Sequence, residues 1–487
     1  MDQSFSWRFF EHFIVAFLQF AVMLVFVRFV APDQMGIAII CLAIFHLVNS
    51  VFVIRLSNVL IQKDEVDELD FSTTLLSQLV LATLFYLILY GSSGVVASWF
   101  QLDVIGTALR IVGVTVFFYA VSSLYTAHII RSIKYSSLFF INSMSALIAA
   151  IICIFLVLFQ YGLFSVLLWT FFYQLFSVLL MVLFYEWRPR MQFSLRRLTS
   201  LVNEGRKQIG VMSGVNALFK NGQQVAVGYF FNPAALSFYV RGERIPAGLL
   251  QQFAHVFHEK LLPLFLKGKD DAKKLHLKIR ELVVLSGFVI LPFMTLIFVT
   301  ADQLILLLFG ERWLFAVPFM QIFCVYYTFL SISSVFSQAM IALDLTGPYI
   351  KINVLKKGIL LLLWLISFPL GIKAVALSMI VFSIISLFLN RFFLKPYINY
   401  GTVQMFKDLA PVFVLSTTMG VLIYLLHYLL PSSLLFIVFQ FVLGALFYGS
   451  LAYFFKLQGW KLLGSTLYAF YTRYAKRRLS SEKSPTL

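Results

Sequence analysis

The stretch "VRFVAPDQMGIAI" (27–39) recurs in altered form 201 residues later as "GYFFNPAALSFYV" (228–240). In both copies a proline, Pro32 or Pro233, stands between two apolar runs. A weaker echo pairs "ASWFQLDVIGTALRIV" (97–112) with "LLLFGERWLFAVPFMQIF" (306–323). Six predicted helices separate the copies, so both halves have the same orientation in a membrane, and such parallel repeats pack as two lobes with the substrate between them. Short proline-containing turns also look alike by chance, and that alternative stays open.

The apolar runs around these turns predict an all-α polytopic membrane protein. The 487-residue chain is 61% hydrophobic and 12% charged, and its runs are long enough to cross about 30 Å of hydrocarbon as helices. They are continuous rather than alternating, which excludes a β-barrel. About fourteen transmembrane helices are expected, at 9–30, 35–59, 71–91, 105–126, 138–158, 163–185, 207–229, 235–258, 281–300, 314–342, 347–368, 374–391, 409–428 and 434–455.

The positive charges divide between the two sides of this bundle. Of the 38 Lys and Arg residues, 30 lie in the termini and alternate connections or in the span ends next to them, two lie in the other connections, and six lie deeper within the spans. By the positive-inside rule both termini are cytoplasmic. The net charge of +17 therefore reflects membrane topology, and no nucleic-acid partner is expected. The connections on the opposite side are short, the longest at roughly 92–104 and 301–313, and leave no room for an extracellular catalytic domain.

Motifs of covalent chemistry and of metal binding are absent from the sequence. It contains no GxxxxGK[ST], HExxH or GxSxG pattern, and no CxxC pair. Its three cysteines, Cys41, Cys153 and Cys324, each fall in an apolar run and are interpreted as small core residues. We expect no cofactor, no metal and no enzymatic activity.

The polar residues inside the spans are the candidates for ligand binding. A charge near the bilayer centre costs at least about 2.5–3.5 kcal/mol on insertion scales, so each needs a reason to persist. Lys220 lies about 20 Å along its predicted helix, too deep to reach either surface easily. The spacing of Arg241 and Arg244 puts them on one face of the next helix. The candidate substrate-binding residues are Lys220, Asn221, Gln223, Gln224, Arg241, Arg244, Arg110 and Arg28.

Two interpretations of this cluster remain. In the first, Glu11 or Glu243 neutralises one cation and the amides bridge helices, while Arg28 and Arg110 extend toward the surface. In the second, the spans hold six cations but only two carboxylates, and the excess positive charge binds a ligand with phosphates and many hydroxyls. Glu11, His12 and Glu243 are also candidates for ion coupling, because a buried carboxylate beside an imidazole could bind and release a proton.

The stretch from 216 to 265 resembles the polysaccharide transporter family. The family pattern is a basic residue, Asn, x, Asp, three residues, Ile and Gly, followed by a turn, Leu-Gly-x-Tyr and a later Arg. "VRFVAPDQMGIAI" resembles the family's first turn, and "LFGERWLFAVPFMQI" (308–322) its GxxWxxAxP turn. Gln223 stands where the pattern has Asp, which removes a carboxylate from this helix. The matching positions are Lys220, Asn221, Val227, Gly228, Leu236, Tyr239 and Arg244.

The resemblance implies a V-shaped exporter fold of the multidrug, oligosaccharidyl-lipid and polysaccharide exporter superfamily. Two six-helix lobes are expected at 1–205, including a cytoplasmic linker, and at 206–398, with helices 13 and 14 and a basic tail at 399–487. The implied function is a flippase (Wzx-like) that moves undecaprenyl-pyrophosphate-linked oligosaccharide across the bacterial inner membrane by alternating access, for O-antigen, capsule or exopolysaccharide. Implied partners are membrane lipids, H⁺ or Na⁺ as coupling ion, and polysaccharide polymerase and assembly proteins.

Two other functions are weighed against this one. A multidrug cation antiporter of the same superfamily would require intramembrane carboxylates, whereas this chain has an excess of Lys and Arg there. An integral-membrane glycan polymerase or ligase would require a long periplasmic loop, which the sequence lacks.

Overall fold

A computed structural model describes residues 2–52, 54–206, 210–266, 272–343, 345–398, 400–427 and 433–465, and these residues form helices and no strand. The first ten helices are α1 (Asp2–Phe29), α2 (Pro32–Phe52), α3 (Ile54–Gln62), α4 (Glu68–Phe100), α5 (Asp103–Gly113), α6 (Thr115–Arg131), α7 (Tyr135–Leu158), α8 (Leu163–Phe184), α9 (Leu195–Arg206) and α10 (Gly210–Phe230). The others are α11 (Pro233–Leu266), α12 (Ala272–Val299), α13 (Ala301–Leu308), α14 (Val317–Ala342), α15 (Thr346–Ser367), α16 (Ile372–Leu394), α17 (Thr402–His427) and α18 (Leu434–Phe454), with 3₁₀ turns η1 (Glu311–Ala316) and η2 (Phe368–Leu370).

Eleven helical segments of the described chain are long and apolar enough to cross a membrane. They correspond to eleven of the fourteen predicted spans, which confirms the all-α membrane fold. The other three predicted spans, 35–59, 207–229 and 235–258, correspond to α2 with α3, to α10 and to α11. Of these, Pro32–Leu47 is a shorter apolar helix. The count of fourteen spans therefore stays a prediction.

Both turns of the internal repeat have the same local structure. Helix α1 ends at Phe29 and α2 begins at Pro32; α10 ends at Phe230 and α11 begins at Pro233, again 201 residues later. A proline is tolerated at the first position of a helix because its missing N–H would have no partner there. The side chain of Asn232 accepts a hydrogen bond from the backbone N–H of Ala235 at 2.6 Å, which caps α11.

The prediction of an outer loop at roughly 92–104 is wrong, because α4 continues to Phe100 and α5 begins at Asp103. The "GSSG" stretch (91–94) at the start of this predicted loop is helical. The hydroxyls of Ser92 and Ser93 donate to the carbonyls of Leu89 and Tyr90 in the same helix, so these polar groups are satisfied without leaving it. Likewise α13 and η1 occupy most of the predicted loop at 301–313.

The chain divides into two compact units, Met1–Ser237 and Phe238–Leu487. Helix α10 belongs to the first unit because it packs along α2. A side chain on Gly228 of α10 would come within 2.7 Å of Ile40, and one on Gly36 of α2 would meet the backbone of Pro233. The lobe boundaries expected from the repeat, at 205 and 398, stay a prediction.

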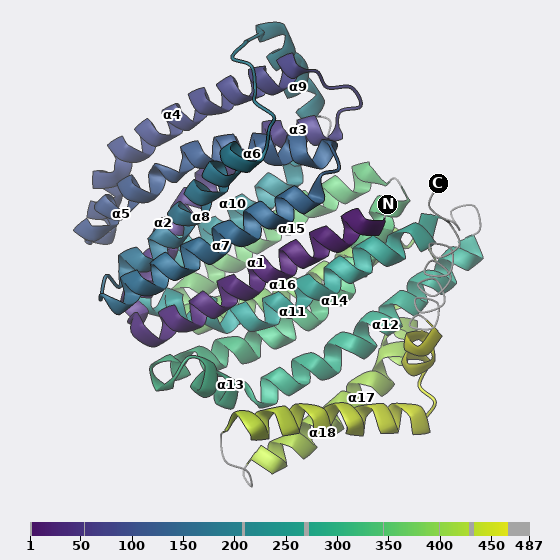
Figure 1. Ribbon diagram of the computed structural model, residues 1–487. Coiled ribbons are helices and arrows are strands. Elements are labelled where there is room, and N and C mark those ends of the chain that lie inside the picture. The colour runs from purple at the N-terminus through teal and green to yellow at the C-terminus, as the bar shows by residue number, and fades with distance from the viewer. Residues whose placement is uncertain are drawn as a thin grey trace, which may run out of the picture. The chain divides into compact units, whose positions relative to one another are not determined.

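The first unit is a bundle in which α1 packs on α7, α7 on α8, and α4 on α5 and α6 (Figure 1). At one end of this unit, Leu60, Leu124 and Leu201 join α3, α6 and the amphipathic helix α9 in one apolar cluster. Helix α9 lies in the predicted cytoplasmic linker between the spans 163–185 and 207–229, where no helix was expected.

In the second unit, α14 packs between α12 and α16, and α17 packs along α12 (Figure 1). An ion pair fixes α17 to α12, since Arg280 donates to both carboxylate oxygens of Asp408 at 2.8 and 2.6 Å. The hydroxyl of Tyr400 donates to the same carboxylate at 2.9 Å. Helix α17 is therefore held by polar contacts as well as by apolar packing.

Candidate functional site

Helix α10 carries the polar stretch that the sequence singled out, and its side chains differ in exposure. Lys220 is exposed, Asn221 and Gln224 are half-buried, and Gln223 is buried. Lys220 lies ten residues after the start of α10, roughly 15 Å along its axis. It interacts electrostatically with His46 of α2. The lysine and the two half-buried amides can therefore offer donors to a ligand, while Gln223 is part of the helix packing.

Helix α11 holds the second set of candidate residues, in the second unit. The guanidinium of the buried Arg241 lies 5.9 Å from the centre of the Trp313 ring, a cation–π distance that offsets part of its desolvation. Arg244 is exposed and interacts electrostatically with Arg241. Glu243 accepts a hydrogen bond of 2.6 Å from the hydroxyl of Tyr327. This face therefore presents Arg244 outward and holds Arg241 inside.

Arg110 and Arg28 occupy different surroundings in the first unit. The Nε of Arg110 donates to the hydroxyl of Ser93 at 2.8 Å, and its guanidinium lies 4.9 Å from the ring centre of Tyr90. These contacts hold Arg110 against α4, although its side chain remains exposed. Arg28 is exposed in the last turn of α1, where a cation is favoured by the helix dipole.

Glu11 has a buried carboxylate, and only one of its two oxygens accepts a hydrogen bond from the described residues. It is 6% exposed, and its Oε1 accepts from the side chain of Asn142 at 2.6 Å. Among the described residues Oε2 has no hydrogen-bond partner, and Tyr173 of α8 interacts with the carboxylate electrostatically. The neighbouring His12 is exposed. Glu11 and His12, which were expected to act as a pair, therefore differ in exposure: the carboxylate is buried and the imidazole is exposed.

A further buried cation, Lys356, was counted in the sequence among the cations of the connections. It lies ten residues into α15, buried, and donates to Oδ1 of Asn390 on α16 at 2.6 Å. The amide nitrogen of Asn390 donates in turn to the hydroxyls of Ser333 and Ser337 on α14, at 2.9 and 2.7 Å. The serine-rich stretch "SISSVFSQ" (331–338) was the sequence signal for this polar core.

Comparison with known proteins identifies the family. A family described as "Polysaccharide biosynthesis protein" matches residues 25–318, which is more than half of the chain. The chain belongs to this family. It is 21% identical over 375 residues to the teichuronic acid biosynthesis protein TuaB of Bacillus subtilis, covering 74% of this chain and 76% of TuaB. It is 27% identical over 176 residues to the lipopolysaccharide biosynthesis protein WzxC of Escherichia coli, covering 36% of each.

Solved structures show the same fold. The chain superimposes on the inward-closed lipid II flippase MurJ with a TM-score of 0.73 at 16% identity, over 92% of this chain and 98% of MurJ. It also matches an inward-facing multidrug MATE transporter with a TM-score of 0.58 at 11% identity, over 79% and 95%. The family match and this exporter fold confirm the predicted resemblance to Wzx-like polysaccharide transporters. The protein is a multi-pass membrane protein and belongs with the transporters of polysaccharide biosynthesis.

Proposed function

We propose that this protein is a flippase that moves undecaprenyl-pyrophosphate-linked oligosaccharide units across the bacterial inner membrane by alternating access, with both termini in the cytoplasm. Its family, the WzxC relative named for lipopolysaccharide biosynthesis and the fold shared with a lipid II flippase support this role. No covalent step is involved. Polysaccharide polymerase and assembly proteins are the partners expected to receive the product.

The observation that carries the proposal is the cationic character of the polar faces on α10 and α11. Lys220 and Arg244 are exposed on helices of a membrane protein, and Arg241 is buried one turn before Arg244. The carboxylate on the same stretch, Glu243, already accepts a hydrogen bond from Tyr327. Exposed cations attract phosphate oxygens through charge-assisted hydrogen bonds, and Asn221 and Gln224 can pair with sugar hydroxyls.

The second candidate function is export of cationic drugs, which the match to a MATE transporter favours by fold. A site for organic cations needs negative charge, and the candidate residues on α10 carry none. For the same reason the lipid-linked anion remains the preferred substrate. A glycan polymerase or ligase would be an enzyme on another architecture, and the exporter fold gives it no support.

Ion coupling is assigned to Glu11 within this proposal, ahead of His12 and Glu243. Its carboxylate is buried and carries one oxygen without a hydrogen bond from the described residues, so it can accept a proton or contact Na⁺. His12 is exposed, and Glu243 is engaged by Tyr327.

Complementation of a flippase-deficient strain tests the substrate-binding role. Lys220→Ala and Arg244→Ala should each lower surface glycan roughly tenfold or more, because a hydrogen bond to a charged group contributes about 1.5–3 kcal/mol. Lys373→Ala is the matched control, since this exposed lysine lies in the first turn of another helix, α16. If both variants support wild-type glycan at normal expression, the cationic-site proposal is wrong.

A further inference from the structure

The segment between α8 and α9 is fixed to the rest of the first unit along one side. The indole nitrogen of Trp187 donates to Glu68 at 2.9 Å, and its ring stacks on His128 with centroids 4.0 Å apart. The backbone N–H of Ser194 donates to the hydroxyl of Thr73 at 3.3 Å. Residues 187–194 are therefore held in place at both ends.

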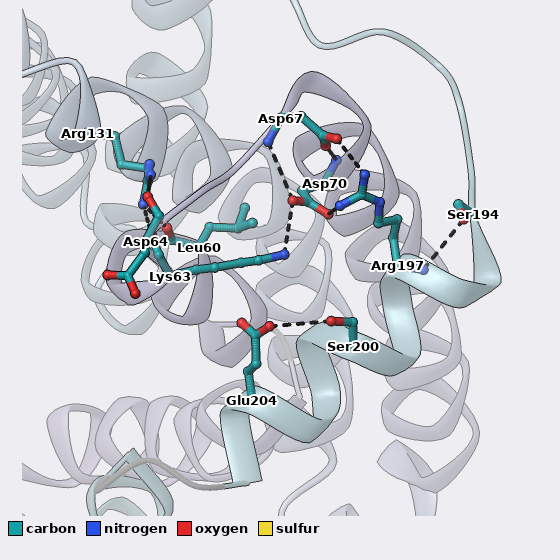
Figure 2. A network of polar contacts seen from close by, with 10 residues as sticks. All are labelled: Leu60, Lys63, Asp64, Asp67, Asp70, Arg131, Ser194, Arg197, Ser200 and Glu204. Carbon is teal, nitrogen blue, oxygen red and sulfur yellow. Dashed lines mark hydrogen bonds and ion pairs between the residues drawn. The ribbon is translucent and has the colours of Figure 1, made fainter.

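A polar network beside this segment pairs Asp67 and Asp70 with neighbouring cations, as Figure 2 shows. Asp70 is fully buried and forms ion pairs with Lys63 at 3.2 Å and with Arg197 at 3.6 Å. Arg197 also pairs with Asp67 at 2.7 Å. Arg131 donates to backbone carbonyls of residues 60, 63 and 64. Within the acidic stretch "KDEVDELD" (63–70), Asp67 and Asp70 are thus engaged by cations and Glu68 by Trp187, while Asp64 and Glu65 are exposed.

Three large apolar side chains on the segment remain uncovered. Met191, Phe193 and Leu195 are 71%, 51% and 67% exposed. Met191 and Phe193 are alternate residues at the end of the non-helical stretch, and Leu195 is the first residue of α9. Arg190 and Arg196, both exposed, flank them. The sequence "RMQFSLR" (190–196) therefore combines exposed apolar side chains with a cation at each end.

The segment adjoins the ends of two helices that are long and apolar enough to cross a membrane. Thr73, which bonds Ser194, belongs to the first turns of the membrane-crossing helix α4. Helix α8 ends at Phe184, and its last residues Leu183 and Phe184 are exposed apolar side chains of a membrane-crossing helix. Met191 follows only seven residues later. The positive-inside rule predicts that this end of the unit faces the cytoplasm, where the leaflet carries anionic lipids.

We propose that residues 190–196 form a membrane-surface anchor that binds anionic phospholipid. Met191, Phe193 and Leu195 enter the boundary between headgroups and acyl chains, while Arg190 and Arg196 contact headgroup phosphates. Charge complementarity selects the partner, because Asp67 and Asp70 beside the segment are paired with Lys63 and Arg197 and the exposed apolar side chains are flanked by the exposed Arg190 and Arg196. This anchor fixes the connection between α8 and α9 to the bilayer surface, and it does not depend on which substrate is transported.

Depth-dependent fluorescence on the full-length protein tests the anchor. The three native cysteines are buried, so a polarity-sensitive thiol label can be directed to Phe193→Cys or to its neighbour Gln192→Cys in nanodiscs. The label at 193 should be quenched by lipids that carry a nitroxide near the headgroup, more strongly than the label at 192. Quenching should increase when phosphatidylglycerol replaces phosphatidylcholine.

Charge variants test the selectivity for anionic lipid. Each arginine near an anionic surface contributes about 1 kcal/mol, equivalent to a fivefold change in affinity. The pair R190Q/R196Q in the labelled background should therefore shift the phosphatidylglycerol dependence by roughly tenfold or more. The control pair K351Q/K395Q removes two exposed cations from other helix ends and should leave the dependence unchanged.

Three results would overturn the proposal. The label at 193 would be quenched equally by a water-soluble quencher in both lipid compositions, or the control pair would reduce the lipid dependence as much as R190Q/R196Q does. In the third, the label would be shielded in native membrane extracts but not in nanodiscs of purified lipid, which would show that a protein covers this surface instead.

Discussion

Replacing Asp70 by asparagine should weaken the attachment of α9 to α3 and α4. Asp70 is fully buried, caps α4 together with Asp67, and pairs with Lys63 and Arg197. Breaking a buried ion pair by removing one partner costs about 3–5 kcal/mol. Here the side chains of Lys63 and Arg197 are 15% and 42% exposed, so water compensates part of the loss. We expect a destabilisation of about 2–3 kcal/mol, a large share of the 5–15 kcal/mol typical of a folded domain.

Thermal unfolding of the detergent-purified protein, followed by intrinsic fluorescence and by size exclusion, measures this effect. Asp67→Asn is the informative comparison, since Asp67 is 49% exposed and asparagine can still cap a helix, so its midpoint should fall much less. Asp64→Asn changes an exposed residue and serves as the control for charge. If Asp70→Asn unfolds at the wild-type temperature, or if Asp67→Asn is the more destabilised variant, the buried network does not hold α9 as argued.

Two further predictions concern packing, one in each unit. Gly228→Ala would place a methyl group within 2.7 Å of Ile40 and should destabilise the protein by about 1–3 kcal/mol through overpacking. Gly222→Ala has its nearest atom at 3.9 Å and should leave the stability unchanged, so the thermal midpoints of the two variants should differ. In the second unit, Asn390→Leu leaves the buried ammonium of Lys356 without its amide acceptor and should cost about 3 kcal/mol or more, while Lys356→Met in the same background should recover most of that loss. An Asn390→Leu variant as stable as the double variant would show that Lys356 has another way to be solvated.

The apolar runs predicted most of the fold because burial in lipid requires long apolar helices. They located the eleven apolar spans, and the two proline turns fixed the starts of α2 and α11. They failed where polar residues stay inside a helix. Ser92 and Ser93 bond to their own helix backbone, so a stretch that looked like a loop continues α4. The amphipathic α9 was missed because its charges dominate its composition.

The candidate site could be predicted as a set of residue types but not as a geometry. Depth along a helix singled out Lys220 as a candidate, which stays a prediction, whereas the contacts of Arg110 with Ser93 and Tyr90 depend on the length of α4, which the sequence did not reveal. Equally, the i, i+3 spacing of Arg241 and Arg244 gave no hint that the first is buried against Trp313 and the second exposed. Such differences come from neighbouring helices that are distant in sequence.

The close approach of Gly36 to Pro233 joins the two copies of the repeated turn to each other. Position 36 in one copy corresponds to Ser237 in the other, so the copies have already diverged at this point. A gene duplication that leaves its two products in contact ties their later histories together. A larger residue at position 36 could become fixed only with a compensating change around position 233. Homologous chains should therefore show correlated substitutions between these two turns.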